Sequence, residues 1–78
     1  MTPTVGSVVH FQHPDVGTCP AFITAVTAEG GVYLTVFPPG YTSGPLNDAY
    51  NQPIAVPFAE TPTDRHWTWP PQTEQPDA

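Results

Sequence analysis

Four side chains are of the types that bind a metal ion or act in catalysis: His10, His13, His66 and Cys19. Zinc is the metal that imidazole and thiolate ligands favour. His10 and His13, however, are three residues apart in a segment that reads as a strand, so their side chains leave on opposite faces. The chain also has a single Cys, and no H-x-x-x-H pair. We therefore expect no metal site and no cofactor.

The same residues could form a Cys–His nucleophile pair. Cys19 begins a segment in which it shares a side with Ala21 and Ile23, which predicts a buried and unreactive thiol. The run DRH at residues 64–66 offers an acid, a base and a cation, but adjacent residues do not share a face. A domain of 78 residues also has little room for a pocket. We therefore expect no catalytic residues and a protein that is not an enzyme.

The charge balance restricts the possible partners. Seven acidic residues oppose one Arg and no Lys, for a formal net charge of −6. Nucleic acid binding and attraction to anionic membranes both depend on Lys and Arg, so neither is expected. The start MTPTVGSVV has no basic region, and CPAFITAVTA is far shorter than the ~20 apolar residues that span a bilayer. These features predict a soluble protein without a signal peptide.

Every segment that carries one of these His or Cys side chains is predicted to be a strand. The segments 5–13, 19–28, 32–37, 54–58 and 66–70 are rich in β-branched and aromatic residues, with Pro57 demoting 54–58 to an edge or a bulge. In 19–28 and 32–37 the apolar residues alternate with period two, and Glu29–Gly31 reads as the turn of a hairpin. The pattern predicts one all-β domain over 1–70, a small five-stranded SH3-like barrel, with an OB-like barrel or an open sandwich as alternatives. A long loop at 38–53 and a polar, Pro-containing tail at 71–78 complete the chain.

The aromatic and aliphatic residues of these strands predict the core. Trp67 and Trp69 are two apart on a strand, so they point to the same face, and Pro70 and Pro71 end that strand because they lack N–H donors. We predict that both rings are mostly buried in the monomer, the alternative being that they face a partner. The expected core consists of Phe11, Ile23, Leu34, Val36, Trp67 and Trp69.

The loop at 38–53 is long for so small a domain, and such loops are often functional. It carries Tyr41, Leu46 and Tyr50 among Gly, Pro, Ser and Asn, a mixture typical of adaptable contact surfaces. We predict that these three residues bind a partner. The alternative is that they fold back and cap the barrel.

Several short motifs, taken in order, resemble a family of small uncharacterised proteins from actinobacteria and their viruses. The family pattern is roughly G-x-x-V-H-Y, then C-x-A-x-I-V-x-V, then a strand running into a Pro-Gly loop, then W-H-W-P. The corresponding stretches are GSVVHF, CPAFITAV, LTVFPPG and HWTWP, and the likeness spans about residues 6–70. This chain departs from the pattern at Phe11, Pro20 and Thr68. The resemblance implies a phage-associated β-barrel located in the virion or the host cytoplasm, and it implies no catalytic mechanism.

Two functions follow as hypotheses. The first is a non-enzymatic protein–protein interaction module, an accessory structural protein of the capsid-decoration type, whose partner is a capsid or other virion protein and which could form a homo-oligomer. The second is a small viral protein that sequesters a host signalling nucleotide, with Arg65 as the candidate phosphate ligand.

Overall fold

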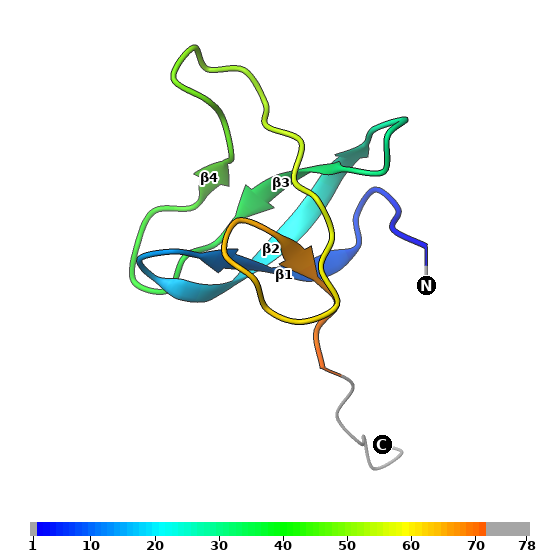
Figure 1. Ribbon diagram of the computed structural model, residues 1–78. Coiled ribbons are helices and arrows are strands. Elements are labelled where there is room, and N and C mark those ends of the chain that lie inside the picture. The colour runs from blue at the N-terminus through cyan, green and yellow to red at the C-terminus, as the bar shows by residue number, and fades with distance from the viewer. Residues whose placement is uncertain (1, 72–78) are drawn as a thin grey trace.

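The structure is a computed structural model that describes residues 2–71 (Figure 1). Its strands are β1 (Val8–His13), β2 (Gly17–Val26), β3 (Val32–Val36), β4 (Gly44–Pro45) and β5 (Trp67–Thr68). They form one sheet in the order β4-β3-β2-β1-β5, and every neighbouring pair is antiparallel. The predicted all-β, five-stranded fold is confirmed. The predicted tail at 71–78 lies, except for Pro71, outside the described residues.

Strands β1, β2 and β3 form a meander with continuous ladders. β1 pairs with β2 residue for residue from Val8↔Phe22 to His13↔Gly17. β2 and β3 are joined by a turn in which the Thr27 N–H donates to the Gly31 carbonyl at 2.8 Å. Gly30 in that turn has φ +94°, a conformation that residues with a Cβ rarely adopt. The predicted hairpin with its turn at Glu29–Gly31 is confirmed.

The predicted alternation appears as alternating burial. One face of the meander is buried and packs together as the core, while intervening residues such as Phe22 and Thr24 are exposed. A bulge between Ile23 and Ala25 interrupts the register of β2 with β3. The buried apolar residues are Val9, Phe11, Cys19, Ala21, Ile23, Val32, Leu34, Val36, Val56 and Trp67.

The fourth predicted strand, at 54–58, was placed wrongly. β4 is instead a two-residue strand inside the predicted loop, where Gly44 and Pro45 pair with Val36 and Thr35. The segment 54–58 forms only isolated bridges, because Pro53 and Pro57 have no N–H to donate to a regular ladder.

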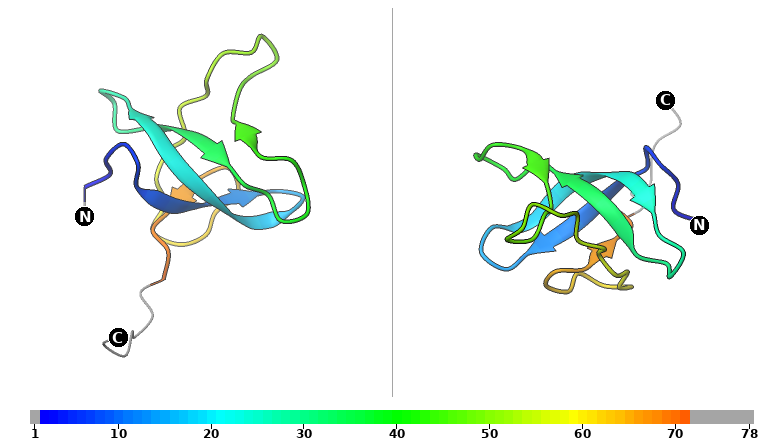
Figure 2. Two further views of the ribbon diagram at one scale, coloured as in Figure 1. Left: turned by 180° about the vertical axis from the view of Figure 1, so that it is seen from behind. Right: turned by 90° about the horizontal axis from the view of Figure 1, so that it is seen from above.

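Those bridges nevertheless close the barrel. Val56 exchanges two backbone hydrogen bonds with Val32, of 2.8 and 3.0 Å. The next two residues, Pro57 and Phe58, contact β5. The Pro57 carbonyl accepts from the Trp67 N–H at 3.0 Å, and Phe58 forms a parallel bridge with Trp67. The 54–58 segment thus connects β3 to β5 across the open side of the curled sheet (Figure 2). The result is a small β-barrel, in which β5 returns to pair with β1.

The last strand is shorter than predicted, but its Trp67 is part of the core. β5 covers Trp67–Thr68 rather than 66–70. Trp67 is only 2% exposed and contacts Phe58 and Trp69, with ring centroids 4.8 and 5.2 Å away. Trp69 is partly buried against the same core. Similarly, β1 begins at Val8 rather than at residue 5, because Gly6 has φ +93° and lies in a turn.

Candidate functional site

The two tyrosines of the long loop are the most exposed aromatic side chains that the structure describes. Tyr41 is 71% exposed and Tyr50 is 85% exposed. Tyr50 stands on a small hydrogen-bonded turn, in which the Asp48 carboxylate accepts from the N–H groups of Tyr50 and Gln52 at 2.8 and 3.0 Å. An ordered backbone therefore presents this ring to solvent.

Leu46, the third residue predicted to bind a partner, lies differently. It is partly buried and packs against the core. Its N–H donates to the Leu34 carbonyl at 3.0 Å, and its own carbonyl accepts from Ile54 N–H at 3.1 Å. Leu46 thus attaches the loop to the barrel, whereas Tyr41 and Tyr50 do not.

An apolar patch on the outer face of the meander was missed by sequence reasoning. This outer patch consists of Val8, Pro20, Phe22 and Phe37, which line a shallow hollow of ≈ 280 Å³ together with Ala21. Phe22 and Phe37 are 43% and 37% exposed and contact each other edge to face, with centroids 5.4 Å apart. The alternation already placed Phe22 on the outward side of its strand. Its pairing with Phe37 depends on the bond from Phe37 N–H to the Pro20 carbonyl, at 2.9 Å, which the sequence pattern does not show.

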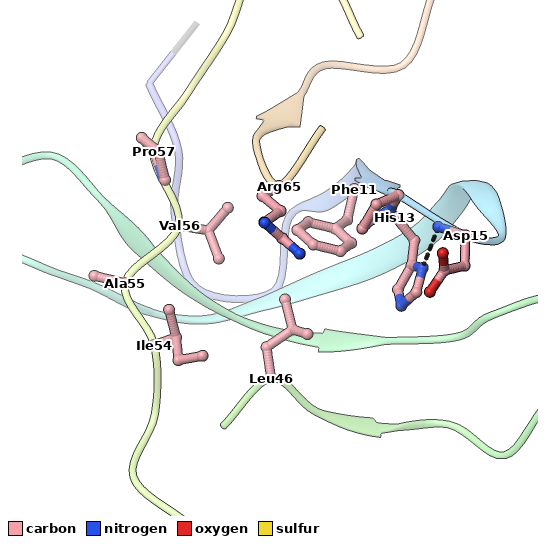
Figure 3. Close-up of a pocket in the computed structure, with 10 residues that line it drawn as sticks. Phe11, His13, Asp15, Leu46, Ile54, Ala55, Val56, Pro57 and Arg65 are labelled. Carbon is pink, nitrogen blue, oxygen red and sulfur yellow. Dashed lines mark hydrogen bonds between the residues drawn. The ribbon is translucent and has the colours of Figure 1, made fainter. Parts of the chain in front are cut away.

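A second hollow, of ≈ 340 Å³, lies beside Arg65, and we call it the Arg65 hollow (Figure 3). Phe11, Leu46 and Val56 point toward the same space, with Arg65 beside the Phe11 ring and His13 and Asp15 at the far side. The hollow therefore combines apolar walls with the single Lys or Arg of the chain. Its lining residues are Phe11, His13, Pro14, Asp15, Leu46, Ile54, Ala55, Val56, Pro57 and Arg65.

The candidate ligating and nucleophilic residues are not brought together. Over residues 2–71, no three His, Cys, Asp or Glu side chains gather closely enough to hold a metal ion. Cys19 is buried, and desolvation raises the pKa of its thiol above the ordinary value. The Nδ1 atom of His13 accepts the N–H groups of Asp15 and Val16 at 3.0 and 3.2 Å, so its proton is on Nε2. His66 instead interacts through Nδ1 with the Asp64 carbonyl at 2.9 Å.

Comparisons with protein-family models, with curated proteins and with solved structures find no match to this chain. In the part of the chain that the structure describes, no helix is long and apolar enough to cross a membrane.

Proposed function

We propose that this protein is a non-enzymatic interaction module that binds another protein through its outer patch and its exposed loop tyrosines. The observation that carries the proposal is the pair Phe22 and Phe37, two large aromatic rings packed on each other at the surface of a small domain. Aromatic residues are enriched at the centres of protein interfaces, where their burial provides much of the binding energy.

The environment of the outer patch supports a protein partner rather than a highly charged partner such as a nucleic acid. The patch has no charged member, and only 10% of the chain is charged. Tyr41 and Tyr50 add amphipathic rings of the kind that make adaptable contacts. A low-charge, aromatic surface suits another folded protein better than a nucleic acid or a lipid headgroup.

Within this class we propose an accessory structural protein of a phage particle, of the capsid-decoration type. The support is the resemblance to proteins of actinobacterial viruses together with an exposed apolar patch on a small acidic barrel. A particle repeats the same site many times by symmetry, so one small protein can bind it in many copies. The partner is then a capsid or other virion protein, and the location is the virion.

The test is quantitative mass spectrometry of purified particles of the virus that encodes this chain. We expect the protein at a stoichiometric level, and a strong reduction for the double variant Phe22→Ser/Phe37→Ser. Val26→Ser is the matched control, because Val26 is also 43% exposed on β2 but is not part of the outer patch. Absence of the wild-type protein from particles would refute the virion role, and equal incorporation of the double variant would refute the role of the patch.

Sequestration of a nucleotide is the second candidate, favoured by the position of Arg65 beside a hollow. Two features weigh against it. The hollow, at ≈ 340 Å³, is near the lower end of the roughly 300–1,000 Å³ typical of small-molecule sites. A phosphate would also meet Asp15 on the far side. Calorimetry with nucleotides tests this function directly, and tight binding that is lost in Arg65→Gln would establish it.

A further inference from the structure

We propose that the Arg65 hollow is a binding site for an apolar monocarboxylate, a compact apolar group that bears one carboxylate. The site is separate from the outer patch, since the two share no lining residue. The proposal therefore goes beyond the proposed function and does not depend on it.

The walls of the hollow select the apolar part of the ligand. Phe11, Leu46 and Val56 line it from three different parts of the fold, and Ile54 lies at the exposed edge (Figure 3). A hollow of ≈ 340 Å³ is small, so it suits one ring or one short aliphatic chain rather than an extended molecule. Burial of apolar surface against these walls provides the non-directional part of the affinity.

Arg65 favours a negative charge on the ligand. It is the single Lys or Arg in a chain of net charge −6, and this exposed residue lines the hollow. A guanidinium presents a planar set of donors that matches a carboxylate with two parallel hydrogen bonds. A guanidinium beside an apolar surface therefore combines the two features that recognise an apolar carboxylate.

The backbone holds Arg65 in place at the hollow. Its N–H donates to the Gln12 carbonyl at 2.8 Å, which fixes it beside the end of β1. Its φ of +65° lies in the left-handed region, which Asn and Gly adopt more easily than Arg does. The bond to Gln12 thus holds Arg65 beside the hollow in a backbone conformation that is unfavourable for Arg.

His13 and Asp15 set the limits of the ligand's charge. The proton of His13 is on Nε2, because Nδ1 accepts two backbone N–H groups, so the ring has one donor remaining. Asp15, on the far side of the hollow, repels every anion, and the repulsion grows with the ligand's charge. It therefore disfavours a dianion more than a single carboxylate bound at Arg65.

The experiment is a nuclear magnetic resonance titration of the ¹⁵N-labelled full chain with four probes. Two are acids, 4-phenylbutyrate and the dipeptide acetyl-Gly-Phe with a free C-terminus; two are their neutral amides. We expect both acids to shift the amide signals of His13, Ala55 and Arg65, and each acid to bind about ten-fold or more tightly than its amide. Binding of the dipeptide alone would identify the source as the C-terminus of a protein, and binding of both would include free organic acids.

Three variants complete the test. Arg65→Asn should weaken acid binding about ten-fold or more without loss of folding, because Asn tolerates a positive φ. Ile54→Ser should weaken the binding of both acids because it removes part of the apolar wall. Val26→Ser should bind as the parent does, because Val26 is exposed and is not a lining residue. Equal affinity for acids and amides, undiminished binding by the folded Arg65→Asn variant, or no signal shift with any probe would each overturn the proposal.

Discussion

The two halves of the barrel are built in different ways. Residues 8–36, which we call the regular half, form three strands with continuous ladders and regular alternation of buried and exposed side chains. Residues 38–66, which we call the irregular half, pair with the first half through the two-residue strand β4 and through one isolated bridge, between Val56 and Val32. Both halves supply the core, because Val56 is as buried as the core residues of the meander. A small barrel therefore needs regular pairing on one side only, provided that a few specific bonds close the other side.

Trp67 contacts both halves of the barrel, so its replacement should have the largest effect on stability. It pairs with Phe11 of β1, and its backbone bonds to Pro57 and Ala59 in the irregular half. Trp67→Ala should cost about 3–5 kcal/mol of the free energy of unfolding, which is most of the stability of a domain this small. Thermal melts followed by circular dichroism measure this loss.

Two further variants serve as controls for Trp67→Ala. Trp69→Ala should cost clearly less, because Trp69 is only partly buried. Trp67→Phe should also be milder than Trp67→Ala, since it keeps a ring in the core and removes the indole N–H, which has no partner among the described residues. If Trp67→Ala melted like the parent, the role assigned to this residue in joining the halves would be wrong.

A pair of glycines compares the turn geometry of the two halves. Gly30 in the β2–β3 turn has φ +94°, whereas Gly44 in β4 does not have a positive φ, and a Cβ at either position would meet no atom within 4 Å. Gly30→Ala should therefore destabilise the protein by about 1–2 kcal/mol through conformational strain alone. Gly44→Ala should be nearly neutral. Chemical denaturation of both variants checks the difference, and equal costs would contradict it.

Cys19 allows a smaller test of the regular half. Burial raises the pKa of its thiol, so the folded state keeps the proton at a pH where the unfolded state loses it. Its contribution to stability is complete below the ordinary thiol pKa of 9.0 and is lost as the pH rises above that value. Denaturation at pH 8 and at pH 10 should show this loss, and it should be smaller in Cys19→Ala. An equal alkaline loss in both proteins would show that other groups cause it.

The smallest expected effect on stability concerns the loop of the irregular half. Tyr41→Ser together with Tyr50→Ser should change the free energy of unfolding by no more than about 0.5 kcal/mol, because both rings are exposed. If the loop binds a partner, the same double variant should reduce incorporation into particles. Loss of folding in the isolated variant would show that these rings pack inward.

Much of the regular half could be predicted from the sequence. Period-two alternation in 19–28 and 32–37 is enough to define both strands and their buried sides, and the Gly pair defines the turn between them. The irregular half could not be predicted in this way. β4 contains Gly44 and Pro45, residues typical of turns, and its strand geometry comes from the bond between Leu46 N–H and the Leu34 carbonyl. A strand defined by a distant partner leaves no periodic pattern of its own.

The candidate sites show the same division. Local periodicity and composition are sufficient to give the all-β class, the hairpin, the buried sides of the meander and the scarcity of positive charge. Tertiary contacts, by contrast, place Phe37 against Phe22, Leu46 on the core and Arg65 beside an apolar hollow. The contact of Phe22 with Phe37 depends on the register of the β2–β3 hairpin. The placements of Leu46 and Arg65 depend on how the barrel closes, and closure involves the packing of all its parts at once.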